Sequence, residues 1–392
     1  MEVIIGDRKY DITNFRHPGG NVIHYMSQGQ DATEAFREFH FRSKRADVVL
    51  RSLPNKPVAR PTDDDRAMLD DFAVFRQQLV IEGFFQPDIP MLVYRILEQL
   101  VLFVGSVWLM RHSAVAAVFL MGLFRARSGW LTHEGGHTSL TGCTAVDRLI
   151  QAFYMGFGLL TSGARWNKMH NRHHAAPQKC NHDTDLDTSP FVSFNEQLSV
   201  SGSSWWIRFQ TYTFLPFTSG IIVPLFWILY LHPRKVFRDR DLCQMCFMVA
   251  GHVVPVCLFC IYGDLSMSAS IGLQCTTLWL SHMYLFGHFA LSHTYTDIIN
   301  STENPSWVRY ANDHSVDIAV GNPIVDWIMG YLNYQVIHHL FPSMPQHRGP
   351  EVSKRWVTFC EKHALEYTRI GYFDAWYRMF ANLNQVGLQQ MN

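Results

Sequence analysis

Long apolar stretches dominate the chain after about residue 88. The first runs over residues 89–130 and is broken at Arg111-His112, so it predicts two helices joined by a tight turn. Each half is close to the ~20 residues that a helix needs to cross a bilayer. The pattern predicts a mostly α-helical, polytopic membrane protein, and the other apolar stretches cover residues 214–231, 242–262 and 265–291.

The N-terminal part is polar and has a different pattern. Residues 3–5 and 9–12 predict two strands around a turn at Gly6, and residues 32–39 predict a helix, so we expect a small α+β fold. A proline-rich and then acidic, helical segment follows and predicts a linker with a cytosolic helix. The expected organisation is a small domain, the linker and a membrane domain, at residues 1–53, 54–88 and 89–392.

Three histidine clusters, HEGGH, HNRHH and QVIHH, carry the chemistry. Residues three or four apart share one face of a helix, so each cluster aims its side chains at one point. Neutral imidazole binds iron, copper or zinc, and a nitrogen-rich site with room for dioxygen favours iron. Seven imidazoles and one amide are too many for one ion, which predicts a two-iron, oxygen-activating site. Its predicted ligands are His133, His137, His170, His173, His174, Gln335, His338 and His339.

The three clusters can meet only if they lie on one side of the membrane. Arg125 and Arg127 near the end of the second apolar helix predict that this end is cytosolic, by the positive-inside bias. The segment 214–231 contains two prolines and is followed by the basic sequence HPRKVFRDRD, so we expect it to be interfacial or re-entrant. Four crossings then remain, with a lumenal turn near Gly263 and a cytosolic, histidine-rich domain.

Composition supports a membrane protein and excludes a nucleic-acid-binding one. The 33 basic and 33 acidic residues cancel, so no overall positive field attracts nucleic acid. Charged residues make up 17%, below the roughly 25% of soluble proteins. The opening sequence MEVIIGDRKY lacks the apolar segment of a cleavable signal, so we expect the N-terminus to stay cytosolic.

Two further patterns suggest metal sites that we reject. The CxxC pairs at residues 243–246 and 257–260 lie in an apolar run without the polar turns of a zinc ribbon, and we expect reduced cysteines in the membrane core. The acidic sequence NHDTDLD lacks the glycine and the bidentate glutamate of a calcium loop. We expect Asp183, Asp185, Asp187 and His182 instead to hydrogen-bond the imidazoles of HNRHH.

The sequences YDITNFRHPGG and GQDATEAFREFH resemble the haem-binding core of cytochrome b5. The resemblance implies that His17 and His40 ligate haem b from opposite faces, with His24 as the alternative to His40. Two axial imidazoles leave no free position for dioxygen, which suits one-electron transfer.

The complete pattern resembles the front-end, cytochrome b5-fusion fatty acyl desaturases, over nearly the whole chain. Its specific marks are the fused haem unit and glutamine at Gln335, and HEGGHTSLTG is similar to the polyunsaturate-forming branch. The resemblance implies one more metal ligand at the cytosolic end of the last membrane helix, for which we favour His293 over His288.

The resemblance also implies the reaction. We expect a cis double bond to be introduced into a polyunsaturated acyl chain, at delta-5 or delta-6, with dioxygen and two iron ions. NADH would supply electrons through a separate NADH–cytochrome b5 reductase and the chain's own haem. The substrate would be linked to coenzyme A or to a phospholipid and lie in an apolar tunnel, and the expected location is the endoplasmic reticulum membrane.

Three alternatives share parts of this pattern. A sphingolipid long-chain-base desaturase has the same fused haem unit and the QxxHH form. A hydroxylase could start from the same hydrogen abstraction. A membrane-anchored haem electron carrier with a dead desaturase part is the third, and the intact histidine clusters argue against it.

Overall fold

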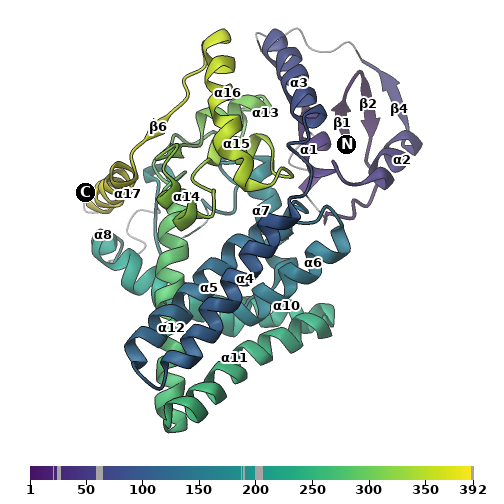
Figure 1. Cartoon of the computed structure of the whole chain (residues 1–392). Coiled ribbons are helices and arrows are strands. Elements are labelled where there is room, and N and C mark those ends of the chain that lie inside the picture. The colour runs from purple at the N-terminus through teal and green to yellow at the C-terminus, as the bar shows by residue number, and fades with distance from the viewer. Residues whose placement is uncertain are drawn as a thin grey trace. The chain divides into compact units, whose positions relative to one another are not determined.

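The computed structural model describes residues 1–20, 22–23, 28–58, 65–186, 188, 190–198 and 206–389 (Figure 1). Contacts divide the chain into two compact units that interleave along the sequence. Unit 1 consists of Met1–Pro87, Asn167–Asp187 and Tyr295–Ala375, and unit 2 consists of Asp88–Trp166, Thr188–Thr294 and Trp376–Asn392.

The N-terminal part of unit 1 is a four-stranded sheet with two short helices, α1 (Thr33–Phe39) and α2 (Lys44–Ser52). The first two strands form an antiparallel hairpin whose turn contains Gly6 at φ +67°, in the left-handed region that suits glycine. This confirms the predicted hairpin. The strand order is β3-β1-β2-β4, with β1 (Glu2–Ile5), β2 (Arg8–Asp11), β3 (Gln28–Asp31) and β4 (Asn55–Pro57).

The rest of unit 1 is built from short helices around an aromatic core. Phe72 of α3 stacks on Phe341 at 5.4 Å between ring centroids, and Trp356 stacks on Phe359 at 4.5 Å. Phe72 and Trp356 are completely buried. The elements are α3 (Arg66–Ile81), α13 (Trp307–Asp313), β5 (Asp317–Ile318), α14 (Pro323–Met329), α15 (Gln335–Leu340), η7 (Gln346–Arg348), α16 (Gly349–Lys362) and β6 (Arg369–Ile370), with β5 and β6 paired in parallel.

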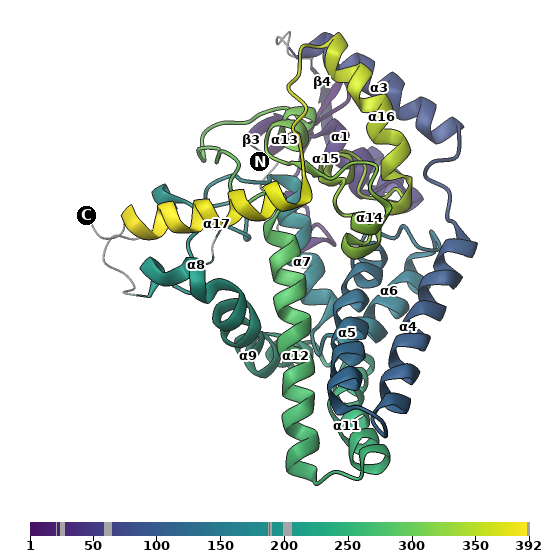
Figure 2. The ribbon, with the colours of Figure 1, turned by 60° about the vertical axis from the view of Figure 1, so that its left-hand side comes forward.

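Unit 2 contains the long apolar helices α4 (Ile89–Leu109), α5 (Ala114–Gly136), α11 (Leu242–Gly263) and α12 (Met267–Ala290). Helix α5 packs against both α4 and α12 and lies between them in Figure 2. The other segments of unit 2 are α6 (Thr144–Phe153), η2 (Tyr154–Gly158), η3 (Glu196–Leu198), η4 (Ile207–Phe209), α8 (Gln210–Thr213), η5 (Phe214–Ile222), α9 (Val223–Phe226), η6 (Trp227–Leu231), α10 (His232–Asp239) and most of α17 (Tyr372–Gln389).

The turns that join α4 to α5 and α11 to α12 lie together. A Cβ atom on Gly263 would come within 2.9 Å of the Met110 side chain, and the Arg111 guanidinium lies 5.1 Å from the centre of the Tyr262 ring. The two helix pairs therefore turn at the same end of unit 2 (Figure 2). The turn predicted at Arg111-His112 and the turn predicted near Gly263 therefore share one side of unit 2, opposite the C-terminal ends of α5 and α12. The lumenal location of that side remains a prediction.

Four helical segments are long and apolar enough to cross a membrane: α4, α5, the continuous run Ile207–Asp239, and α11. The predicted number of spans is confirmed, but the prediction counted α12 and not the run 207–239. Among the described residues α12 misses this set because it carries buried polar side chains, including Gln274 and Thr277. At 24 residues and about 1.5 Å per residue, α12 is nevertheless long enough to span a bilayer.

The run 207–239 has an irregular backbone. Two of its segments, η5 and η6, are π-helical, and prolines begin the short α-helices between and after them. Figure 2 shows α8 and α9 running obliquely to α12. The re-entrant or interfacial path predicted for 214–231 remains a prediction.

The two arginines from which we predicted a cytosolic end of α5 do not lie at the end of that helix. Arg125 lies inside α5, fully buried, and donates hydrogen bonds to Thr277, Gln274 and two backbone carbonyls. Arg127 is also buried and pairs with Glu98 at 2.8 Å. Their predicted position at a helix end was wrong, and because both arginines are satisfied inside the protein they give no positive-inside signal. The cytosolic orientation of the end of α5 remains a prediction.

The two CxxC pairs lie on one continuous helix, α11, so they cannot form a zinc ribbon. Cys243 and Cys257 are fourteen residues apart, which is about 21 Å along a helix axis. All four cysteines are free thiols, and three of them are exposed on the helix surface. The rejection of the zinc site is confirmed.

Candidate metal centre

The cluster HNRHH lies on α7 (Gly163–Ala175), as its spacing predicts. His170 and His174 are one helical turn apart, and their Nε2 atoms are 3.0 Å from each other. His173 points to a different neighbour, because its Nε2 atom lies 3.2 Å from Nε2 of His339. The helix therefore presents its three imidazoles in two directions.

The cluster QVIHH lies on α15, a helix of only six residues. A helix this short is not stable by itself, so its position depends on tertiary contacts. The backbone N–H of Val336 donates to Asp317 at 2.8 Å, and the Tyr367 hydroxyl donates to the other oxygen of the same carboxylate. Burial raises the pKa of Asp317 to about 7, against the effect of these hydrogen bonds. Asp317 thus fixes the N-terminus of α15, a role that we did not predict from the sequence.

Within unit 1 the side chains of the second and third clusters come together. Nε2 of His338 is 3.0 Å from Nε2 of His174, and the Gln335 amide nitrogen is 3.3 Å from Nε2 of His339. His170, His174 and His338 form one group of nitrogens within 4.8 Å of one another. His173, His339 and Gln335 form the second group.

The spacing of these nitrogens fits metal ions. Two nitrogen ligands bound at right angles, each about 2.1 Å from a metal, lie about 3 Å apart. The observed separations are 3.0 Å within the first group and 3.2 Å between His173 and His339. Because the nitrogens divide into two groups, the arrangement fits two ions better than one.

Asp183 orients the imidazole of His173. Its carboxylate lies 2.9 Å from Nδ1 of His173, and the backbone N–H groups of Gln178 and Asp185 also donate to it. This contact leaves Nε2 of His173 as the ligating nitrogen, which is the usual arrangement of a metal-bound histidine. The expectation that the acidic segment supports HNRHH is confirmed for Asp183, whereas Asp187 lies outside the described residues.

The electrostatics of the His173–Asp183 pair favour the charged forms. Burial would lower the pKa of His173, but Asp183 and Asp185 outweigh burial and raise it to about 9. Burial would likewise raise the pKa of Asp183, but His173 and the two backbone N–H groups hold it below its ordinary value. The carboxylate therefore remains available to a metal-bound imidazole.

The cluster HEGGH belongs to unit 2, where His133 lies in the last turn of α5 and His137 follows as its C-cap. Their ring centroids are 4.9 Å apart, and both rings contact the indole of Trp166. Glu134 forms a buried ion pair with Arg95 of α4. Glu134 therefore holds α5 against α4.

The two candidates for a further ligand differ in their surroundings. His288 is buried in α12, where Nδ1 lies 2.7 Å from the Tyr284 carbonyl oxygen and the ring packs against Trp376. His293 lies beyond the end of α12 and is half-buried. This position agrees with the reason for favouring His293, which remains a prediction.

A second pair of histidines lies in the N-terminal part of unit 1. The rings of His17 and His40 are 5.8 Å apart between centroids. Two imidazoles on opposite sides of one iron, each bound at about 2 Å, have centroids roughly 6 Å apart. Nδ1 of His40 donates to the Phe36 carbonyl at 3.0 Å, which leaves Nε2 for a metal. The pair fits haem, and the alternative, His24, lies outside the described residues.

The environment of this pair also fits a bound porphyrin. A Cβ atom on Gly19 would come within 2.8 Å of the His17 ring, so only glycine lets the ring take this position. Gly20 has φ +80°, which also favours glycine. Burial lowers the pKa of His40, so the ring is neutral at pH 7 and can act as a ligand.

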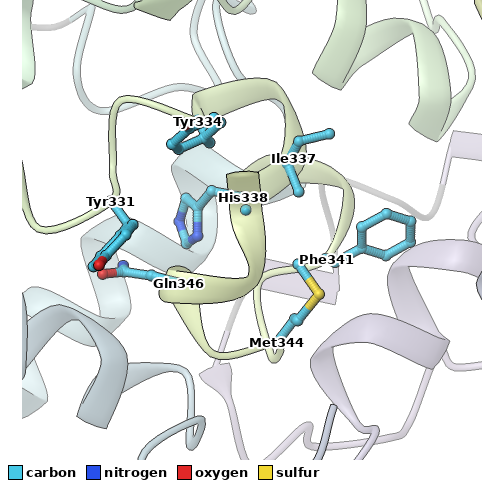
Figure 3. Close-up of a pocket in the computed structure, with 8 residues that line it drawn as sticks. Tyr331, Tyr334, Ile337, His338, Phe341, Met344 and Gln346 are labelled. Atoms are coloured by element: carbon cyan, nitrogen blue, oxygen red, sulfur yellow. The ribbon is translucent and has the colours of Figure 1, made fainter. Parts of the chain in front are cut away.

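A small cavity lies beside His338 in unit 1. It has a volume of about 10 Å³, room for about one water molecule, and its walls include Tyr331, Gln346 and Phe341. Figure 3 shows the His338 ring between the side chains of Tyr331 and Tyr334. The cavity is too small to hold an acyl chain, so it is not the predicted substrate tunnel.

Comparisons with known proteins agree with these two sites. The profile of the fatty acid desaturase family matches residues 107–371, and the profile of the cytochrome b5-like heme/steroid binding domain matches residues 2–76. An acyl-lipid (8-3)-desaturase of Rebecca salina is 42% identical over 98% of this chain and 91% of its own length. An acyl-lipid (8-3)-desaturase of Thraustochytrium sp is 39% identical over 98% and 92%. A delta(8)-fatty-acid desaturase of Euglena gracilis is 28% identical over 92% and 89%.

Proposed function

We propose a specific reaction for this chain, which belongs to the fatty acid desaturase family and carries a cytochrome b5-like domain at its N-terminus. It is a membrane oxidoreductase of the front-end desaturase type. The proposed reaction introduces one cis double bond into a polyunsaturated acyl chain, with dioxygen as the oxidant. The observation that carries the proposal is the convergence of five imidazoles of unit 1 in two groups with metal-ligand spacing.

We propose that these groups hold two iron ions. Five imidazoles are fewer nitrogens than two six-coordinate irons can bind, so further ligands are needed. We propose that the remaining ligands are His133 and His137, which are four residues apart in HEGGH, and the half-buried His293 beyond the end of α12. The proposed ligands are therefore His133, His137, His170, His173, His174, His293, His338 and His339, with Gln335 at the edge of the second group.

We propose that the N-terminal domain binds haem b through His17 and His40. Haem held by two imidazoles supplies one-electron transfer and no oxygen chemistry. A separate NADH-dependent reductase would deliver the electrons to it. The distance between the two rings and the hydrogen bond of His40 to Phe36 support this assignment.

The proposed reaction balances with two electrons from the reductase. The acyl chain loses two hydrogen atoms, and dioxygen accepts these together with two electrons and two protons to form two water molecules. An unactivated C–H bond cannot be broken by side-chain acid–base chemistry, so bound iron supplies the oxidising power. The protein holds the imidazoles: Asp183 fixes His173, and Asp317 fixes the helix that carries His338 and His339.

For the substrate we propose an acyl chain esterified to a membrane lipid, because the relatives in Rebecca salina and Thraustochytrium are both named acyl-lipid desaturases. We propose that the chain shares their (8-3) positional class, with delta-5 or delta-6 as the positions favoured from the sequence. The proposed location is the endoplasmic reticulum membrane, with the N-terminus and the histidine clusters in the cytosol.

Expression in a host that makes no polyunsaturated fatty acids tests the proposal. Cells would be fed acyl chains with double bonds in defined positions, and the lipids would be analysed by mass spectrometry with double-bond localisation. A new double bond on the carboxyl side of an existing one, in phospholipid before the coenzyme A pool, is the expected result. His173→Ala, which removes one imidazole of the second group, is the inactive control.

Each alternative gives a different result in the same experiment. Modified ceramides would replace the proposal by a sphingolipid desaturase, and hydroxylated acyl chains would indicate a hydroxylase. An unchanged lipid profile together with a haem spectrum would indicate an electron carrier without desaturase activity. Full desaturation by His173→Ala would refute the assigned ligand.

A further inference from the structure

The N-terminal domain makes buried contacts with the other parts of unit 1. Glu38 of α1 forms an ion pair with Arg76 of α3, and the Ser343 hydroxyl lies 3.5 Å from the same carboxylate. Glu38 is 2% exposed and Arg76 is 8% exposed. Separating the two side chains would leave a buried charge without its partner, which disfavours opening of this contact. The helix that leads to His40 is therefore fixed to unit 1 and is not connected by the linker alone.

A pair of aromatic side chains also connects the N-terminal domain to the rest of unit 1. The ring of Phe39 meets the ring of Trp307 edge-on, with centroids 6.0 Å apart and planes at 81°. This is a favourable geometry for aromatic rings. Trp307 begins α13 and is buried, with 7% of its surface exposed.

Trp307 also contacts the helix of the third histidine cluster. Its indole N–H donates to the carbonyl oxygen of Leu340 at 3.3 Å, in a buried environment. Leu340 follows His339 directly in α15, and Phe39 precedes His40 directly at the end of α1. The contacts therefore form a continuous path from His40 through Phe39, Trp307 and Leu340 to His339.

We propose that Phe39 and Trp307 conduct electrons from the haem side of unit 1 to its metal centre. This inference rests on the proposed function, since it requires haem at His40 and iron at His339. One electron moves at a time, so that one haem iron goes from ferrous to ferric and one iron of the histidine centre goes from ferric to ferrous. No covalent bond is formed or broken along the path.

The physical reason is the steep decrease of electron tunnelling with distance and with empty gaps. Covalent bonds, a hydrogen bond and two rings in contact connect the two histidines through Phe39 and Trp307. The other contact, Glu38 to Arg76 and Ser343, contains only saturated or charged side chains. That contact positions the domain, and the aromatic pair is the better electronic bridge.

The test measures haem reoxidation in the full-length protein, loaded with haem and iron in nanodiscs. The reduced protein is mixed rapidly with dioxygen and an acyl-lipid substrate, and haem absorbance is followed in a stopped-flow instrument. His173→Ala gives the background rate of direct haem oxidation. Trp307→Leu should slow the substrate-dependent phase by an order of magnitude or more, and Phe39→Leu should slow it in the same direction.

Trp356→Phe is the matched control. Trp356 is a fully buried tryptophan of the same core, and its indole N–H donates to the Asn312 side chain at 3.1 Å, whereas that of Trp307 donates to Leu340. It therefore loses a similar buried hydrogen bond without interrupting the path. Trp307→Phe keeps a ring but loses the bond to Leu340, so it should slow transfer less than Trp307→Leu.

A second measurement separates electron transfer from a structural role. Dithionite reduces both cofactors directly, so in a single turnover started from dithionite-reduced protein the amount of product should be the same for Trp307→Leu and wild type. A product yield that falls equally under dithionite would show that Trp307 is only structural. Wild-type reoxidation rates in Trp307→Leu and Phe39→Leu would overturn the path. If Trp307→Leu binds no haem, the haem reoxidation rates of Trp307→Phe and Phe39→Leu decide whether the path exists.

The same experiment distinguishes a failure of the electron path from a failure of the proposed function. Absence of substrate-dependent haem reoxidation and of product in the wild type would refute the function itself. Normal wild-type turnover with unchanged rates in both path variants would refute only the path.

Discussion

The two units of this protein differ in where some of their largest apolar side chains lie. Unit 2 exposes Val101, Trp108 and Phe119 at 60% or more of their surface and buries the guanidinium of Arg125. Unit 1 buries Phe72 and Trp356 completely in an aromatic core. Apolar surface is stable in lipid and costly in water, so the difference follows from the surroundings of the unit 2 helices.

Both units nevertheless contain buried polar groups, and these have different purposes. In unit 1 the buried imidazoles face one another and are held by carboxylates, in a geometry that suits metal ions. In unit 2, Arg125 and Gln274 donate to the backbone carbonyl of Gly251. That carbonyl has no helical partner, because residue 255, one turn later, is a proline inside α11. The buried Arg125 guanidinium therefore completes the backbone hydrogen bonding of α11 in unit 2.

The largest expected effect comes from removing an imidazole of the first nitrogen group of unit 1. His170→Ala should abolish desaturation and lower bound iron, because it removes one of the three nitrogens of the first group. Its effect on the unfolding free energy of the metal-free protein should stay within about 1 kcal/mol, since the half-buried ring serves the metal and not the core. Product analysis, iron content and thermal unfolding measure the three quantities.

His314→Ala is the control for this prediction. His314 lies in unit 1 outside the three clusters, and its Nδ1 lies 2.7 Å from the Asp297 carbonyl. Activity and iron content should be unchanged in this variant. If His170→Ala unfolded the protein as strongly as a core substitution, the buried histidines would have a structural role and the comparison between the units would fail.

The next effect should come from Arg125 and should be one of stability. Arg125→Leu leaves the Gly158 carbonyl and the Gln274 side-chain oxygen without this donor, whereas the Gly251 carbonyl keeps the Gln274 amide. Each buried polar group left unsatisfied costs about 1–3 kcal/mol. We therefore expect unit 2 to lose about 2–5 kcal/mol, measured by thermal unfolding in detergent. Haem absorbance should be retained, because His17 and His40 lie in unit 1.

Arg111→Leu is the matched control, because it removes the same charge from an exposed position in a helix turn. We expect a change in unfolding free energy of less than about 0.5 kcal/mol there. Equal unfolding temperatures for Arg125→Leu and wild type would show that the Gly158 carbonyl and the Gln274 side-chain oxygen are satisfied in another way. Buried polarity in unit 2 would then need a different explanation.

Much of the site could be predicted from the sequence because helical spacing is a local property. The positions of His170, His173 and His174 follow from one helix, an argument that needs only the backbone period and the residue type. The pair His17 and His40 was predicted instead from the resemblance of its surrounding sequence to cytochrome b5. Neither prediction required knowledge of the tertiary structure.

The rest depended on contacts that local patterns do not contain. Asp317 reaches the N-terminus of α15 from 19 residues away, and nothing in its neighbourhood marks it. Arg125 was assigned to a membrane surface by its charge, but its partners come from three distant segments. The compact units interleave along the chain, so no composition boundary could have predicted them.

The smallest effect tests whether a buried carboxylate of unit 1 outside the metal centre reduces stability. Burial raises the pKa of Glu34 above its ordinary value of 4.5, although Arg37 opposes this. Between 4.5 and the raised value the folded protein binds more protons than the unfolded one, so stability falls as pH rises through this window. Glu34→Gln should flatten that slope, as measured from the haem-monitored unfolding temperature.

Glu2→Gln should act in the opposite direction, because hydrogen bonds from Lys9 and Lys56 lower the pKa of the exposed Glu2 and stabilise its ionised form. An unchanged slope in Glu34→Gln would mean that Arg37 fully offsets burial, and buried carboxylates of unit 1 would then be neutral to stability.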